Sequence, residues 1–199
     1  MLKAQRIGVV FAIALLASIS AFAETSTWDI DPQHSTAHFT VRHFGISNVT
    51  GSFTKVSGTA NIDSADIAKS TVKATIDVSS VDTRVEMRDK DLRSPNFFDV
   101  EKYPTIEFNS KRITKTGDNV QVVGDLTIHG TTRGVTLNVD DMTPEVADPW
   151  GNTRRGFSAN TSINRKDFGL TYNNLLKTGE AVVGEAIKIQ IDVEFVKKK

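Results

Sequence analysis

Apolar and polar residues alternate strictly near the end of the chain. The apolar members of this segment, which are separated by Lys, Gln, Asp and Glu, are Ile187, Ile189, Ile191, Val193 and Phe195. A period of two places the apolar side chains on one face of a β-strand and the charged ones on the other. The same alternation predicts further strands over residues 28–30, 37–41, 56–62, 72–78, 106–108, 120–128, 135–139 and 157–163. Glycine-containing turns between these segments predict an antiparallel sheet of sequential hairpins.

The composition also favours strands. Residues 24–199 contain 18 Val, 12 Ile and 22 Thr but only 6 Leu, and β-branched side chains suit a pleated surface. Each strand has one dry face, which a single antiparallel sheet hides by curling into a closed ring. We therefore predict an all-β fold, an antiparallel up-and-down barrel of about eight strands. A two-sheet sandwich is the alternative, since it also gives each strand one dry face.

One segment departs from the alternating pattern. Thr83 and Glu86 have the spacing of a helix capping box, with Thr83 as the N-cap. Val85 and Leu92 then share one helical face, and Pro95 stops the helix. We predict a short helix of about 11 residues across one mouth of the barrel. The aromatic residues that follow it form either a gate or a hydrophobic plug.

The first residues have the features of a cleaved export signal. Lys3 and Arg6 precede an apolar stretch over residues 7–19, and residues 21–23 read Ala-Phe-Ala, a cleavage sequence. The stretch is shorter than the ~20 residues that a membrane-spanning helix needs, so we predict no integral membrane anchor. Removal of residues 1–23 leaves one predicted domain, 24–199, with a net charge of −2.

Charge and cysteine content exclude several classes of function. The chain has 24 basic and 24 acidic side chains without a basic stripe, so general binding of nucleic acid is not expected. It has no cysteine, which excludes disulfides and thiolate chemistry. His34 and His38 lie ~13 Å apart on an extended strand, too far to bind one metal ion together. We predict no catalytic residue, no metal and no cofactor.

The contents of the barrel decide the function. Large inward side chains alternate with small ones such as Ala37, Gly58 and Gly124, which predicts free space in a tall, narrow, apolar lumen. Such a lumen suits an extended hydrocarbon chain, with His43 as a hydrogen-bond partner for a head group. The predicted ligand-binding residues are Phe39, Val41, His43, Ala74, Ile76, Phe97, Phe98, Phe108, Leu126, Ile128, Leu137, Phe157, Ala159, Ile189 and Ile191. Two alternatives stay open, an enzyme acting on an apolar substrate and a structural module with a filled barrel.

Several short motifs occur together in a characteristic order. They are Trp28-Asp29-Ile30-Asp31, Phe39-Thr40-Val41-Arg42-His43, Leu92-Arg93-Ser94, Tyr103-Pro104, Gly124-Asp125-Leu126-Thr127-Ile128-His129-Gly130 and Asn164-Arg165-Lys166-Asp167-Phe168-Gly169. In this order they resemble the YceI-like family. The resemblance implies a lipocalin-like barrel in the bacterial periplasm, without established catalysis. It implies a long-chain isoprenoid lipid, such as an isoprenoid quinone, as the partner. A homodimer is compatible with the family, although nothing in the sequence indicates one.

Overall fold

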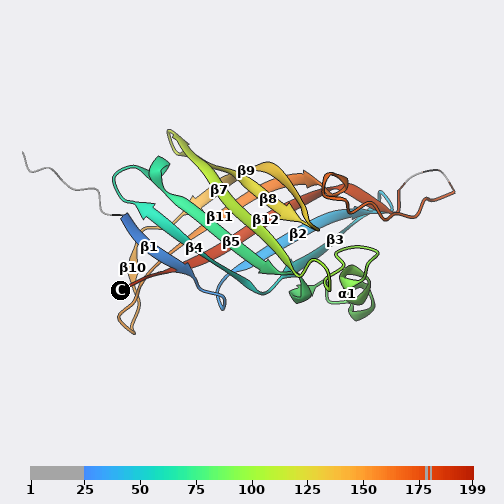
Figure 1. The fold of residues 1–199 in the computed structure, drawn as a ribbon, viewed down its shortest axis with the longest axis horizontal. Helices are drawn as coiled ribbons and strands as arrows, with labels where there is room; N and C mark the ends of the chain where they lie inside the picture. The colour runs from blue at the N-terminus through green and yellow to red at the C-terminus, as the bar shows by residue number, and fades with distance from the viewer. Residues whose placement is uncertain (1–24, 178, 180) are drawn as a thin grey trace, which may run out of the picture.

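The computed structural model describes residues 25–177, 179 and 181–199, and the predicted signal peptide lies outside them. The described residues form one twisted antiparallel sheet of twelve strands (Figure 1). The strands are β1 Thr25–Ile30, β2 Thr36–His43, β3 Ser47–Phe53, β4 Val56–Asp63, β5 Thr71–Asp77, β6 Val81–Asp82, β7 Thr105–Thr116, β8 Asn119–Ile128, β9 Thr131–Met142, β10 Val146–Ala147, β11 Thr153–Asn164 and β12 Val183–Lys197.

The sheet closes on itself. Three pairs of consecutive strands, β1 with β2, β3 with β4 and β5 with β6, each act as one long bent strand of the ring. Together with β7, β8, β9, β11 and β12 they make an eight-stranded barrel. The ring is completed where β12 pairs with β11 on one edge and with β1 and β2 on the other. The predicted up-and-down barrel is confirmed, and the two-sheet sandwich is wrong.

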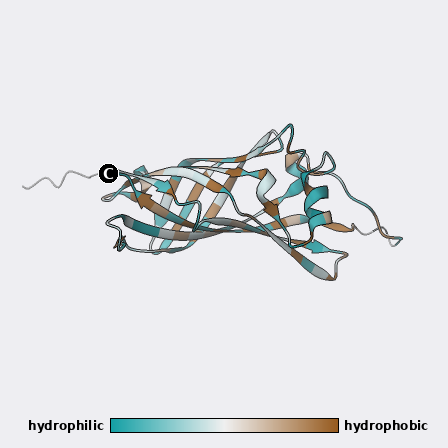
Figure 2. Ribbon diagram, turned by 90° about the horizontal axis from the view of Figure 1, so that it is seen from below, coloured by the Kyte–Doolittle hydropathy of each residue, from teal (hydrophilic) through white to brown (hydrophobic). Residues whose placement is uncertain are grey.

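One long strand of the barrel, β3, was absent from the predicted set. Its inward positions include Gly51, so the apolar alternation is interrupted. The strand predicted over residues 106–108 is also longer, because β7 continues past an irregularity between Ser110 and Arg112. Hydrophobic and hydrophilic residues alternate along most strands, as Figure 2 shows. This alternation places the hydrophobic core inside the ring.

The helix is shorter than predicted, and the prediction of a capping box at Thr83 and Glu86 is wrong. Helix α1 spans Glu86–Arg93, and its N-cap is Val85, which makes no capping hydrogen bond through its side chain. Thr83 instead donates from both its backbone N–H and its hydroxyl to the buried carboxylate of Asp89, at 2.9 and 2.5 Å. Because Asp89 holds Thr83 away from the capping position, the helix begins at Glu86, two residues later than predicted.

The two ends of the barrel differ. We call the end that carries α1, the β2–β3 turn and residues 169–177 the helix end, and the opposite end, which carries Trp28, β10 and the turn over residues 31–35, the far end (Figure 1). Trp28 is fully buried in a cluster with Ala60 and Phe195. Within the described part of the chain, no helix is both long and apolar enough to cross a bilayer.

Candidate functional site

The barrel encloses an apolar tunnel. Thirty of the described residues line it, and 27 of these are apolar. The lining runs from Leu92 and Phe97 at the helix end to Ile30 and Phe195 toward the far end. Trp28 belongs to the same cluster as Ile30 and Phe195 but does not line the tunnel, so the tunnel ends on the inner side of that cluster.

The tunnel is not filled by the protein's own side chains. Its volume is about 190 Å³, more than ten times the ~10–15 Å³ that one water molecule needs. Among the described residues, the polar members of its lining are His38, Thr161 and Arg165, and the half-exposed ring of His38 lies on the outer face near Asp192. A cavity with so few hydrogen-bonding groups suits an apolar guest better than ordered water.

The structure places most of the predicted binding residues around this tunnel. Those that line it are Phe39, Val41, Ala74, Ile76, Phe97, Phe98, Phe108, Leu126, Ile128, Leu137, Phe157, Ile189 and Ile191. Two of the predicted residues do not line it. The ring of His43 packs on Phe44, with 4.0 Å between ring centroids, and Ala159 is a fully buried member of the hydrophobic core.

The sequence suggested that small inward residues leave free space in the lumen. In the structure, two inward glycines are instead covered by aromatic rings. A Cβ atom at Gly51 would lie 2.4 Å from Cζ of Phe39, and one at Gly124 would lie 2.6 Å from Cζ of Phe108. Each glycine therefore makes space for an aromatic ring on a neighbouring strand. The free volume of the tunnel is what remains after these rings have been accommodated.

Aromatic rings form the wall of the tunnel near α1. Phe53 packs on Phe39 at 5.7 Å and on Phe98 at 5.6 Å between ring centroids. Phe97 meets Tyr172 edge to face at 5.1 Å, which links the segment after α1 to the segment after the 3-10 turn η3 (Arg165–Phe168). Phe97 and Phe98 both line the tunnel, so this aromatic wall forms its boundary beside α1.

Hydrogen bonds anchor α1 to the barrel. Arg93 donates from Nε to the carbonyl of Ser79 and from Nη2 to the carbonyl of Val81, at 3.0 and 3.1 Å. Arg88 donates to the hydroxyl and the carbonyl of Thr83, at 2.7 and 2.9 Å. These arginines therefore hold the helix at the strand ends, and neither lines the tunnel.

Arg165 is a buried cation in the tunnel wall. Its side chain is 3% exposed and donates to the backbone carbonyls of Leu170, Tyr172, Val183 and Gly184. Burial lowers the pKa of Arg165, and the charge of Glu185 partly offsets this effect. The contacts join η3 to the start of β12, so Arg165 fixes the shape of the helix end.

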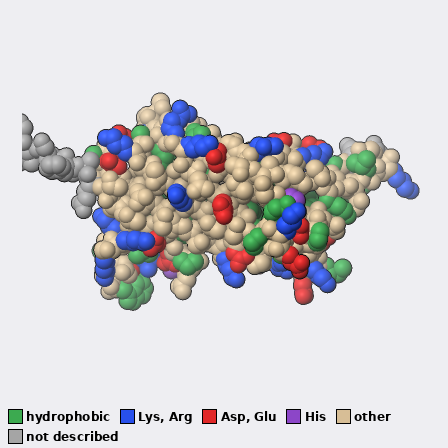
Figure 3. Space-filling model, in the orientation of Figure 1, with side chains coloured by type: hydrophobic (Ala, Val, Ile, Leu, Met, Phe, Trp, Pro, Cys, Tyr) green, Lys and Arg blue, Asp and Glu red, His purple; other side chains and the backbone are tan. Residues whose placement is uncertain are grey.

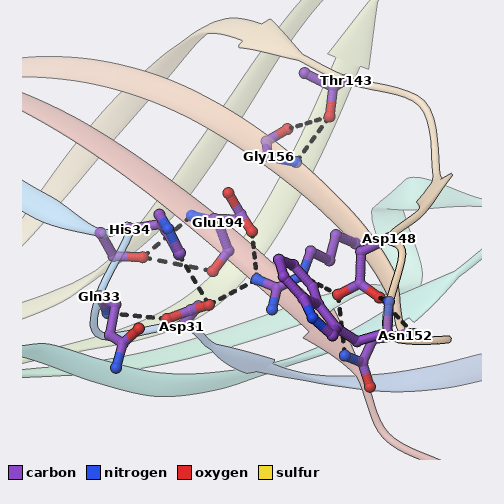
Figure 4. A network of polar contacts seen from close by, with 11 residues as sticks. Asp31, Gln33, His34, Thr143, Asp148, Asn152, Gly156 and Glu194 are labelled. Carbon is purple, nitrogen blue, oxygen red and sulfur yellow. Dashed lines mark hydrogen bonds and ion pairs between the residues drawn. The ribbon is translucent and has the colours of Figure 1, made fainter.

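A second polar cluster lies at the far end (Figure 4). Arg154 donates to Asp148 at 2.7 Å, to Asp31 at 2.6 Å and to Glu194 at 2.5 Å. Burial alone would raise the pKa of Asp31, but hydrogen bonds from Arg154, from the Gln33 N–H and from His34 lower it to about 2. The hydrogen bond from Arg154 likewise lowers the pKa of Asp148, and these carboxylates raise the pKa of Arg154.

Asp31, His34 and Glu194 in this cluster have ligand atoms within 4.8 Å of one another. Such a group could hold a metal ion by distance alone. However, Nη1 of Arg154 already contacts both carboxylates, so a cation would have to compete with a guanidinium. The arrangement is that of a charged clamp between β12, β11 and the β1–β2 turn.

Sequence patterns missed several residues of the tunnel. Phe53 lies on the unpredicted strand β3, and Arg165 and Leu170 belong to η3 and the residues that follow it. Val183 begins β12 before the strict alternation starts at Ile187. The parity of β12 could have identified Val183, but no periodic signal marks Arg165 or Leu170.

Comparison with known proteins identifies the family. The model of the YceI-like domain matches residues 28–195. The chain belongs to the YceI-like family. A UPF0312 protein of Photorhabdus laumondii is 37% identical over 199 residues, which cover all of both chains. The resemblance seen in the motifs is thereby confirmed.

Solved structures share the fold. BcnA of Burkholderia cenocepacia has a TM-score of 0.71 at 24% identity, over 83% of this chain and 98% of that chain. A polyisoprenoid-binding domain from Saccharophagus degradans has a TM-score of 0.63 at 17% identity, over 86% of this chain and 98% of that chain. At these levels of identity, the two structures support the architecture of the barrel.

Proposed function

We propose that the protein is a non-catalytic carrier that holds a long isoprenoid lipid inside the barrel. The observation that carries this proposal is the tunnel itself, because 27 of its 30 lining residues are apolar. The polyisoprenoid-binding domain with the same fold supports the choice of ligand class. An isoprenoid quinone or a polyprenyl chain fits this description.

The shape of the tunnel favours an extended chain. Val183 and Phe195 both line it and lie at opposite parts of β12, about 40 Å apart at ~3.3 Å per residue. The usual tilt of barrel strands shortens this to roughly 30 Å along the axis. Such a space accepts a long, thin hydrocarbon more readily than a compact sugar or nucleotide.

Burial of apolar surface would supply the affinity. Each 100 Å² of ligand surface removed from water contributes about 2.5 kcal/mol before the cost of ordering the chain. The tunnel argues against the alternative of a filled structural barrel. For the enzyme alternative, the polar residues in the described lining are His38, Thr161 and Arg165, and the hydrogen bonds of Arg165 to the described residues go to backbone carbonyls.

The carrier would act in the periplasm after cleavage of residues 1–23. The support for this is the charged start, the apolar stretch and the Ala-Phe-Ala cleavage sequence. Mass spectrometry of protein isolated from cells would test it. The expected mature N-terminus is Glu24, and an intact Met1 on the purified protein would contradict this part of the proposal.

The ligand can be identified by organic extraction and mass spectrometry of the protein purified from its native envelope. We expect a stoichiometric isoprenoid lipid with the wild-type protein. The Ala74→Trp variant should lose it, because the indole enters the tunnel, at a cost of ~1–3 kcal/mol in stability. Thr75→Trp, on the next and outward-facing position of β5, is the matched control and should retain the lipid. Equal lipid content in both folded variants would refute binding in the tunnel.

A further inference from the structure

Large apolar side chains project into solvent at the tip of the helix end. Phe44 and Ile46 lie in the β2–β3 turn, and Tyr172 and Leu175 lie in the segment that follows η3. Ile46 is 78% exposed and Leu175 is 70% exposed. Figure 3 shows hydrophobic side chains at this end of the molecule. Exposed apolar groups that gather in one place mark an interaction surface, and we call these four residues the apolar tip.

Backbone hydrogen bonds hold the two segments of the apolar tip side by side. The N–H of Phe44 donates to the carbonyl of Val182 at 2.9 Å. The N–H of Val182 donates to the carbonyl of Asn174 at 2.9 Å, and Leu175 forms a β-bridge with Ala181. The β2–β3 turn and the segment around Leu175 therefore present one continuous surface.

The apolar tip is continuous with the tunnel. Tyr172 contacts the ring of Phe97, which lines the tunnel. Val41 and Val183 also line it, and they are close neighbours in sequence of Phe44 and Val182. A chain leaving the tunnel at the helix end would therefore meet apolar surface before it met water.

Basic residues flank the apolar tip. Arg42 and Lys177 are exposed, and residues 42–48 and 171–177 contain no acidic side chain. The neighbouring Glu185, at the start of β12, is paired with Lys166, and Glu180 lies outside the described part. Apolar side chains accompanied by cations are typical of surfaces that sit in the interface of an anionic membrane. We propose that the apolar tip docks on the surface of an anionic lipid bilayer, so that the lipid passes directly between the bilayer and the tunnel. This inference rests on the proposed function, because it names the source of the tunnel's ligand.

The far end supplies an internal comparison. Trp150 is 78% exposed and Val146 is 55% exposed, so this end also displays apolar side chains. However, the cluster around the fully buried Trp28 separates that end from the tunnel. If exposure of apolar side chains were sufficient, both ends would bind a bilayer. The proposal assigns docking to the helix end only.

The test measures binding of the full mature chain to vesicles of phosphatidylethanolamine and phosphatidylglycerol by flotation. We expect the wild type to bind. The Ile46→Ser/Leu175→Ser double variant should bind at least tenfold more weakly, because it lacks two exposed apolar side chains that would insert into the bilayer. Trp150→Ser is the matched control and should bind as the wild type does. Unchanged binding of the double variant, or a loss of binding in Trp150→Ser alone, would overturn the proposal.

A second measurement separates docking from tunnel binding. Each protein is titrated with cis-parinaric acid, a fluorescent polyene, in free solution without vesicles. Retained probe binding with lost vesicle binding in the double variant supports docking. A wild type that binds the probe but no vesicles overturns docking and leaves the carrier function intact, whereas a wild type that binds vesicles but no probe refutes the tunnel function. Light scattering tests whether the apolar tip instead binds a second copy of the chain. A wild-type dimer that binds no vesicles and that the double substitution converts to a monomer would support this alternative.

Discussion

Different interactions stabilise the two ends of the barrel. At the far end, Arg154 joins three carboxylates, and Trp28 is buried with no exposed surface. At the helix end, the hydrogen bonds that Arg165 makes within the described part of the chain go to backbone carbonyls, and the contact between Phe97 and Tyr172 bridges two irregular segments. The far end thus combines paired charges with a packed core, while aromatic contacts and hydrogen bonds to backbone carbonyls join the irregular segments of the helix end.

The two arginines show the difference most clearly. The carboxylates around Arg154 raise its pKa, because each of them stabilises the charged form. Burial lowers the pKa of Arg165, whose carbonyl partners carry only partial charges. A guanidinium that binds carbonyls holds the loops of the helix end together through their backbones. The same residue type therefore closes one end and shapes the other.

Removing the packed side chain of the far end should have the largest effect. We expect Trp28→Ala to lower the free energy of unfolding by about 3–5 kcal/mol, because it leaves a large cavity in a fully buried cluster. Urea unfolding followed by circular dichroism measures this. Trp150→Ala at the same end is the control and should change stability by less than about 0.5 kcal/mol, since its side chain is exposed. Equal losses in both variants would show that the far end is not sealed by packing.

An intermediate effect is expected on the side of the helix end. The added Cβ in Gly51→Ala would approach Phe39 to 2.4 Å and Cγ2 of Thr83 to 2.7 Å. We expect a loss of about 1–3 kcal/mol in unfolding free energy and less bound lipid, since the ring of Phe39 must move into the tunnel. Gly134→Ala on β9 is the control, because no atom lies within 4 Å of the position that its added methyl group would take. A Gly51→Ala protein with normal stability and lipid content would contradict this account.

The smallest effect concerns acid. Asp31 has its pKa lowered from 3.8 to about 2, so it stabilises the folded state above pH 3.8 and loses this contribution as the pH falls toward 2. Asp31→Asn should therefore have a lower Tm than the wild type at neutral pH, and the difference should shrink near pH 2. Thermal unfolding at several pH values tests this. Asp192→Asn, which changes a half-exposed side chain outside the Arg154 cluster, is the control. A Tm difference between Asp31→Asn and the wild type that stays constant with pH would refute the stabilising role of the Arg154 cluster.

The strands were predictable because each carries its own period-two signal. β12 alternates over its whole second half, and its partner β11 repeats the pattern through Phe157 and Ile163. β3 escaped because Gly51 occupies an inward position that Phe39 covers. The start of α1 was wrong because Asp89, from the helix itself, captures Thr83. Pairings of this kind between individual side chains leave no periodic trace in the sequence.

The tunnel was predictable to a similar extent. Strand parity alone directs Phe108, Leu126 and Ile189 inward, and all three line the cavity. Parity failed for His43, which ends its strand and turns to Phe44. The Arg154 clamp was not foreseen, because its members come from four segments of the chain. At the strand ends and in the Arg154 cluster, burial and charge pairing depend on how the closed ring brings distant segments together. The sequence pattern does not specify these individual contacts.

The strands that complete the ring come from opposite parts of the chain. Trp28 pairs with Lys197, and Ile30 pairs with Phe195, so the seam joins residues with the greatest separation along the polypeptide. We expect contacts of such long range to form late in folding, because the entropy of closing the intervening loop must first be overcome. Until the last strand adds to the first, the protein has two open edges and no interior. If the tunnel holds a lipid as proposed, we expect the lipid to enter only after this seam has formed.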